Sequence, residues 1–217
     1  MRQVAIPTAA LAGVPAGIQA NGVWLGRRQL FVRFAAEAET ATMYTPDALA
    51  GELTRQVGRS AYHSISVAGR DPLSNAAFLV AALRTAAPAI PVMLDCDGQR
   101  PEVVAEVSGF LALFQVTLEG SSTDSVIEHS VESLRNAARS SAAHAMVLAP
   151  EEKTTDGQLL RIISQVHVAS GATAIVIHPP AGSTEKDRRW LTFMEQASAL
   201  HGDTRVMQRL PRPTGMR

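Results

Sequence analysis

The sequence predicts an α/β fold in which six β/α units and a closing strand form a partial barrel around a parallel sheet. The expected strands are continuous apolar runs, which is typical of strands covered on both faces. Each is followed by a segment whose apolar residues recur at helical spacing. A complete eight-unit barrel takes about 250 residues, and this chain has 217, so we expect a single partial-barrel domain over residues 1–217.

The first half of the chain supplies three of these units, after an N-terminal strand and loop within Met1–Gly17. Two of its helical segments, 46–58 and 101–107, open on proline, and the capping residue Thr45 precedes the first of them. Ser74 or Asn75 is the expected cap of the segment 76–85. Strands and helices alternate here at 30–34, 46–58, 61–67, 76–85, 91–95 and 101–107.

The second half continues the same alternation, and apolar spacing defines its helices. Thr123 is the expected cap of the first of them. The expected order is 111–118, 123–141, 145–148, 156–169, 173–177 and 185–200, with a closing strand at 205–208.

Composition excludes several classes of function. Twenty basic and twenty acidic residues give no net charge, which disfavours broad electrostatic binding to nucleic acid. The lone Cys96 excludes an internal disulfide and an all-cysteine metal site. No apolar run reaches the roughly 18 residues that span a bilayer. The motifs GxGxxG and GxxxxGK[ST] are absent, which disfavours the nucleotide-binding doubly wound folds. We expect a cytoplasmic protein without nucleic-acid or membrane partners.

Polar side chains follow the expected strands, at the edge where parallel strands place their chemistry. Asp95, Asp97 and Glu119 are oxygen donors that a hard divalent cation could bind, although their spacing matches no metal-site signature. His178 follows the most regular apolar strand and is a candidate general base. A histidine held in place by hydrogen bonds is the structural alternative.

Residues 17–49, GIQANGVWLGRRQLFVRFAAEAETATMYTPDAL, resemble the opening of radical S-adenosylmethionine (SAM) enzymes, in particular 7-carboxy-7-deazaguanine synthases, with the pattern SIQGEG followed by GRPxVFVRFxGCxLxCxxCDTPYAL. Three further segments match in order. They are SVAGRDPL at 66–73 beside TGGEPLL, DCDG at 95–98 beside ETNG, and RVMQRLPRPTGMR at 205–217 beside RVxPQxHKxLGxR. The resemblance implies a partial barrel of the radical SAM type.

The departures from this family concern its chemistry. The three cysteines that hold its [4Fe–4S] cluster are missing, and Glu37 stands at the first of them. Carboxylate oxygens replace thiolates poorly at such a cluster, so we expect neither a cluster nor radical chemistry. Gly69 and Asp71 fall in the SAM-binding motif. There Asp71 replaces the glutamate that takes the SAM ammonium, and Arg70 adds a positive charge.

The resemblance also implies a ligand site for a deazapurine. Gln19, Arg33 and the magnesium-contacting Thr45 are retained, while Asn21 replaces a substrate-binding glutamate. Each has a structural alternative: Gln19 as a hydrogen-bonding loop residue, Arg33 as the partner of a rim glutamate, Thr45 as a helix cap. Asp71 has the same alternative as a cap.

Three hypotheses follow. In the first, which the combined losses favour, the protein is a non-catalytic partner subunit, scaffold or regulator, as a homodimer or in complex with another protein. Trp24 is its candidate interface anchor, and no cofactor or metal is expected. In the second, the chain is a repurposed non-radical enzyme, in which Glu37, Asp71, Glu119 or His178 supports the chemistry with a divalent cation or SAM. In the third, it is a sensor of SAM or a purine-like ligand.

Overall fold

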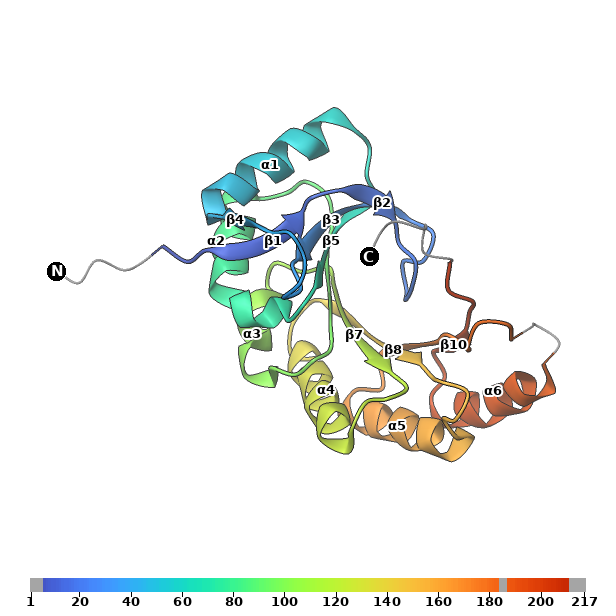
Figure 1. The fold of residues 1–217 in the computed structure, drawn as a ribbon. Helices are drawn as coiled ribbons and strands as arrows, with labels where there is room; N and C mark the ends of the chain where they lie inside the picture. Colours follow the sequence, from blue (N-terminus) through green and yellow to red (C-terminus); the bar gives the residue numbers. More distant parts are fainter. Residues whose placement is uncertain (1–5, 184–186, 211–217) are drawn as a thin grey trace.

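The computed structural model describes residues 6–183 and 187–210, which form an α/β fold around one open sheet (Figure 1). Seven strands form a continuous parallel part of the sheet, in which each strand runs parallel to its neighbour. These parallel strands are β3 (Arg28–Phe34), β5 (Ser64–Gly69), β6 (Val92–Cys96), β7 (Leu113–Glu119), β8 (Ala143–Ala149), β9 (Ala174–Ile177) and β10 (Thr204–Val206). The sheet does not close into a barrel, because β10 ends it on one side.

A second group of short strands extends the sheet beyond β3. They are β1 (Ala9–Gly13), β2 (Ala16–Ile18) and β4 (Thr42–Tyr44). Both β1 and β2 pair antiparallel with β3, and β4 pairs antiparallel with β1. The strand order is therefore β10-β9-β8-β7-β6-β5-β3-β1-β4, with β2 beside β3.

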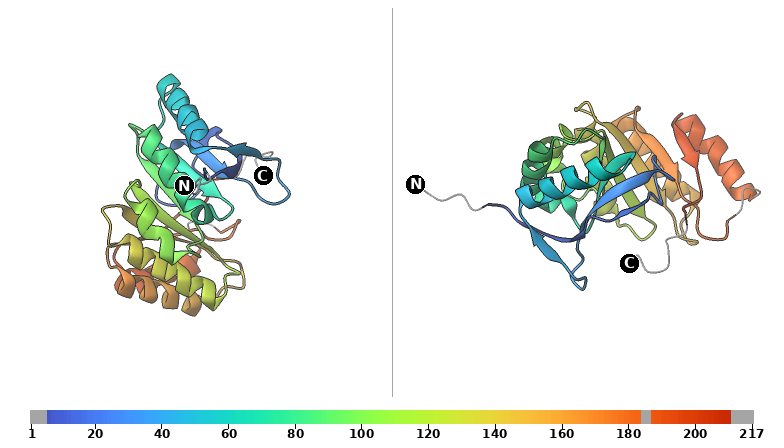
Figure 2. Two further views of the ribbon diagram at one scale, coloured as in Figure 1. Left: turned by 90° about the vertical axis from the view of Figure 1, so that its left-hand side faces the viewer. Right: turned by 90° about the horizontal axis from the view of Figure 1, so that it is seen from above.

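Helices follow the parallel strands and cover the convex side of the curved sheet (Figures 1 and 2). They are α1 (Pro46–Arg59), α2 (Ala76–Ala86), α3 (Val104–Ser108), α4 (Asp124–Ala137), α5 (Asp156–Ala169) and α6 (Arg188–Leu200), with 3₁₀ turns η1 (Pro72–Asn75) and η2 (Pro101–Val103). Six β/α units and a closing strand are thus confirmed. Within the described residues, no helix is long and apolar enough to cross a membrane.

Threonine caps fix where three of the helices begin. Thr45, Thr123 and Thr155 each accept a hydrogen bond from the backbone N–H three residues further on. The side-chain oxygen of Gln158 also accepts from the backbone N–H of Thr155, which completes a capping box. The caps predicted at Thr45 and Thr123 are confirmed.

The largest differences from the sequence-based expectation concern the short strands. Strands β2 and β4 were not predicted, since three residues are too few to show a period. The helix expected over 123–141 ends at Ala137, and the one expected at 101–107 begins as a 3₁₀ turn. Part of the expected helix start at 185 and the end of the family-like segment, residues 211–217, lie outside the described residues.

The two faces of the sheet differ in composition, and this difference positions the site. The helix-covered face carries the main apolar core, which includes Phe114, Val116 and Leu118 of β7. The concave face instead buries polar side chains, namely those of Gln29, Ser64, Ser66 and Gln115. It also carries a small apolar cluster of Met93, Leu113 and Ala145.

Candidate functional site

The concave face of the sheet is occupied by the loop between β2 and β3, residues 19–27, which we term the inner loop. Its ends are joined by backbone hydrogen bonds from Gln19 to Arg27 (2.9 Å) and from Gly26 to Gln19 (2.8 Å). Its middle binds the sheet through the backbone N–H of Val23, which donates to Oε1 of Gln115 at 3.2 Å. Val23 and Trp24 pack against the apolar cluster of the concave face.

Gly22 allows this close approach of loop and sheet. Its φ of +73° is in the left-handed region that favours glycine. A Cβ atom at this position would lie 2.0 Å from Oε1 of Gln115. Glycine therefore lets the inner loop sit on the sheet without displacing the side chain of Gln115.

His178, at the end of β9, is held by two hydrogen bonds. Its Nδ1 lies 2.7 Å from the carbonyl oxygen of Met207, which only accepts, so Nδ1 carries the hydrogen. Nε2 then accepts from the backbone N–H of Gly22 at 2.8 Å. Burial lowers the pKa of His178, and the positive charge of Arg209 lowers it further. The lone pair on Nε2, which a general base would use, therefore already accepts a hydrogen bond. This arrangement matches the structural alternative, a histidine held in place by hydrogen bonds.

Asp95 is the centre of a polar cluster next to the inner loop. Its Oδ1 accepts from the hydroxyl of Thr117 at 2.7 Å. Burial raises the pKa of Asp95, and hydrogen bonds from Thr117, Gln115 and Asn21 offset part of this rise. Nearby, Arg209 donates to Glu119 at 3.1 Å. This cluster joins the ends of β6 and β7 to the inner loop and to the segment after β10.

Asp95 and Glu119 are predicted from the sequence as candidate site residues, whereas Gln115 and Thr117 are not. The available signal was their alternate placement within the apolar run LFQVTLE, which turns both toward the concave face. The divalent site considered for Asp95, Asp97 and Glu119 is not formed. Within residues 6–183 and 187–210, no three His, Cys, Asp or Glu side chains come together in a group that could hold a metal ion.

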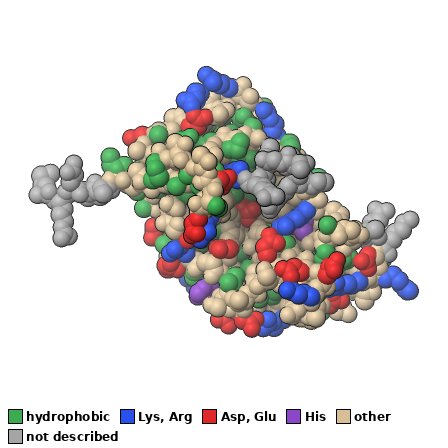
Figure 3. Space-filling model, viewed as in Figure 1, with side chains coloured by type: hydrophobic (Ala, Val, Ile, Leu, Met, Phe, Trp, Pro, Cys, Tyr) green, Lys and Arg blue, Asp and Glu red, His purple; other side chains and the backbone are tan. Residues whose placement is uncertain are grey.

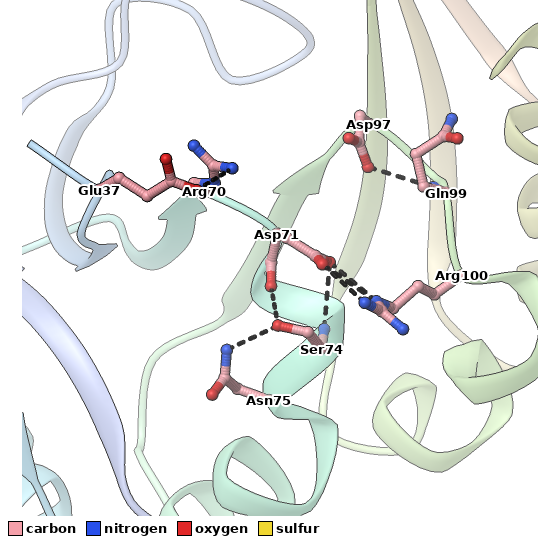
Figure 4. A network of polar contacts seen from close by, with 8 residues as sticks. All are labelled: Glu37, Arg70, Asp71, Ser74, Asn75, Asp97, Gln99 and Arg100. Carbon is pink, nitrogen blue, oxygen red and sulfur yellow. Dashed lines mark hydrogen bonds and ion pairs between the residues drawn. The ribbon is translucent and has the colours of Figure 1, made fainter.

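Gly69 and Asp71, the candidate cofactor-binding residues, have structural roles, and Figure 4 shows the contacts of Asp71. Gly69 has a φ of +108°, and a Cβ there would lie 2.3 Å from the carbonyl oxygen of Phe34 on the neighbouring strand. Asp71 caps η1 by accepting from the backbone N–H of Ser74. Its carboxylate also receives a bidentate pair of bonds from Arg100, at 3.0–3.1 Å. The capping alternative for Asp71 is confirmed.

The charged residues of the loop after β3 form ion pairs on the surface. Glu37, with 82% of its side chain exposed, binds Arg70 at 2.7 Å. Arg33 binds Glu39 at 2.8 Å, which confirms its expected pairing with a rim glutamate. Figure 4 shows Arg70 turned toward Glu37 and away from Asp71.

The ligand residues implied by the resemblance are divided between separate places. Gln19 donates to Asn21 at 2.8 Å, and Asn21 reaches Asp95. Thr45 caps α1. Trp24, the expected interface anchor, is half-buried and places its ring edge-on to that of His63, with centroids 4.9 Å apart. It therefore holds the inner loop in place.

Comparison with known proteins gives a limited result. No protein-family model matches the chain, and no curated protein matches it. One similar solved structure is a type I 3-dehydroquinate dehydratase from Clostridium difficile, with 13% identity over 72% of this chain and 67% of that chain, at a TM-score of 0.42. Another, described as a fructose-1,6-bisphosphate aldolase from Coccidioides immitis, has 13% identity over 73% and 71%, at a TM-score of 0.32. Neither likeness bears on the activity of this chain.

Proposed function

We propose that this chain is a non-catalytic protein that acts by associating with another polypeptide, as a partner subunit, scaffold or regulator. The proposal retains the radical SAM-like character of the sequence but includes neither a [4Fe–4S] cluster nor radical chemistry. The observation that supports it best is the inner loop. Barrel enzymes bind their substrates at the carboxyl ends of the strands. In this chain the inner loop lies at that place, because Gly22 binds His178 at the carboxyl end of β9.

The pairing of the charged candidate residues supports the same proposal. Asp71, Glu37 and Arg33 each bind an oppositely charged side chain of the chain itself. A cationic cofactor would have to displace the guanidinium of Arg100 from Asp71, and bidentate pairs of this kind are among the stronger hydrogen-bonded contacts.

A second candidate function is a ligand sensor or a non-radical enzyme, and the cluster around Asp95 favours it. Buried carboxyl groups with raised pKa values are more frequent at functional sites than elsewhere. In addition, Nε of Arg209 is buried and has no hydrogen-bond partner among the described residues. In this alternative a polar ligand displaces the inner loop and binds Arg209 and the cluster around Asp95.

Calorimetric titration with SAM tests the proposal against a SAM sensor that uses Asp71. The titrated proteins are the unmodified chain, the Arg100→Gln variant, which frees Asp71 for a cation, and the control Arg161→Gln. The control removes an arginine that pairs with Asp124 on the surface. We expect no binding heat from any of the three. Micromolar binding that strengthens in Arg100→Gln alone would overturn the proposal and support a ligand sensor.

Anaerobic reconstitution with iron and sulfide tests the absence of a cluster. The protein is expected to retain no iron after desalting and to show no charge-transfer absorption. Brown protein with stoichiometric iron and sulfide would overturn the proposal, because it would require cluster ligands other than the missing cysteines.

A further inference from the structure

We propose that the edge of the sheet formed by β1 and β4 is a self-association surface, which pairs with a second copy of this chain around a two-fold axis. The inference rests on the proposed function, since it names the partner of a protein that acts by association. β4 is the last strand of the sheet, and among the described residues no strand lies beyond it. Within this part of the chain its outer backbone groups have no strand partner, and such an edge is available to pair with another strand.

The sequence along this edge contains no charge. Positions 3–26 and 40–46 include no Asp, Glu, Lys, Arg or His. Exposed edge strands usually carry charged residues that prevent pairing between molecules. The opposite edge follows that rule, because β10 carries Arg205, which binds Asp203 at 2.9 Å. The two edges of the same sheet are therefore built differently, and only the β4 edge lacks charge.

Large apolar side chains are exposed at this edge. Met43 is 64% exposed at the middle of β4, and Ile6 is 72% exposed shortly before β1. Ala10, the partner of Met43 in the β1–β4 pairing, is exposed as well. Figure 2 shows the blue β1–β4 region extending beyond the helices, and Figure 3 shows hydrophobic side chains on the side where these strands lie.

Two of the acidic residues close to the edge are paired within the chain. Glu39 is paired with Arg33, and Glu37 with Arg70. An uncharged surface gives an acidic or basic partner nothing to recognise, whereas two copies of it meet without like-charge repulsion. The chain as a whole also has no net charge. These features match a second copy better than a charged partner of another kind.

The geometry of an edge strand suits a two-fold arrangement. An antiparallel strand pairs with its own copy through the same residues on both sides, as an isologous interface requires. Position 43 of one copy then lies near position 43 of the other. Stable interfaces bury about 800 Å² on each partner, more than a three-residue strand supplies. The apolar face around Ile6 and Ala10 would have to contribute the remainder.

Opposite charges introduced at position 43 test this arrangement. Light scattering after size-exclusion chromatography should find the unmodified chain as a dimer. The variants Met43→Lys and Met43→Glu should each be monomers because like charges face each other, and an equimolar mixture should again form dimers. The control Val168→Lys changes a side chain that is 78% exposed on α5 and should stay dimeric.

A cysteine at position 43 provides an independent readout. Cys96 is buried, and burial raises its pKa, so it should not react. Mild oxidation should cross-link Met43→Cys into a covalent dimer and leave Val168→Cys monomeric. A chain that is monomeric over the whole concentration range, or a dimer that ignores both charges at position 43, would overturn the inference. Either result leaves the SAM and iron experiments unaffected, so the two proposals can fail separately.

Discussion

The backbone N–H of Gly22 donates to Nε2 of His178, a contact between residues 156 positions apart in the chain. It joins the inner loop to the far end of the parallel sheet. The other ring nitrogen of His178 binds the carbonyl of Met207, in the segment after β10. One neutral imidazole therefore connects three parts of the chain that would otherwise meet only through packing.

This contact predicts a loss of stability in acid. Because the pKa of His178 is lowered below its ordinary 6.5 in the folded state, its contribution is fully present above pH 6.5 and is lost as the pH falls through the lowered value. Protonated Nε2 cannot accept from Gly22. Arg209 favours the neutral ring and Glu119 the charged one. Hydrogen exchange should show the Gly22 amide losing protection on acidification.

The variant His178→Gln isolates this effect, because its side-chain oxygen can accept from Gly22 without titrating. Its free energy of unfolding should depend less on pH between 4 and about 7 than that of the unmodified chain. The control His129→Gln changes an exposed histidine on α4 and should leave the dependence unchanged. Equal pH dependence in all three proteins would show that His178 does not hold the inner loop.

Gly22→Ala should detach the inner loop from the sheet. The added Cβ would meet Gln115 at 2.0 Å and would also sit at a φ of +73°. We expect a loss of about 2–4 kcal/mol in denaturant unfolding. Gly26→Ala is the matched control, because its φ is +81° but no atom lies within 4 Å of the added Cβ. The difference between the two variants measures the clash with Gln115 alone, and equal losses would contradict a tight contact.

The sequence predicts the parallel core of this fold well, because its signals are local. Helix α5 begins and ends where apolar spacing places it, and Thr155 stands at its cap. The concave face could not be predicted in the same way. The approach of Gly22 to Gln115 joins residues far apart in the chain, and no pattern in either segment specifies it.

Side-chain direction limited the prediction of the candidate site. Strand periodicity places Arg70 and Asp71 at the end of β5, but it does not determine which carboxylate each arginine binds. In the structure Arg70 binds Glu37, while Asp71 takes Arg100 from the loop after β6. The left-handed backbone of Asp71, with a φ of 39°, directs its side chain in a way that no residue pattern indicates.

Gly69→Ala should be among the most destabilising substitutions in the chain. Its Cβ would lie 2.3 Å from the backbone oxygen of Phe34, which a strand paired in register cannot move aside. A loss of about 2–4 kcal/mol in denaturant unfolding is expected. Gly109→Ala, where no atom lies within 4 Å of the added Cβ, should stay within about 0.5 kcal/mol of the unmodified chain. Similar losses in both variants would contradict close packing as the reason for glycine at position 69.

Thr45→Ala should lower the free energy of unfolding by about 1 kcal/mol, because it removes the cap of α1. In that cap the hydroxyl of Thr45 accepts from the backbone N–H of Ala48 at 3.2 Å. Thr45→Ser keeps the hydroxyl and should retain most of the stability. Thermal unfolding of the three proteins checks this. A Thr45→Ala variant as stable as the unmodified chain would mean that the cap contributes little to the stability of α1.

The pair of Asp71 and Arg100 can be separated from the cap that Asp71 also forms. Asp71→Asn keeps an oxygen for the backbone N–H of Ser74 and tolerates the left-handed backbone, but it removes the charge that binds Arg100. Asp71→Ala removes both contacts. We therefore expect Asp71→Ala to be less stable than Asp71→Asn. The difference should not depend on salt, because it measures the cap and the cost of placing alanine in a left-handed backbone.

A double-mutant cycle of Asp71→Asn with Arg100→Gln measures the ion pair itself. The hydrogen bond and the charge of Asp71 raise the pKa of Arg100, which indicates a favourable contact. Both side chains are partly exposed, at 36% and 43%, so the coupling should be small and should shrink further at about 1 M salt, where screening acts over about 3 Å. A coupling that survives high salt would indicate a pair shielded from solvent.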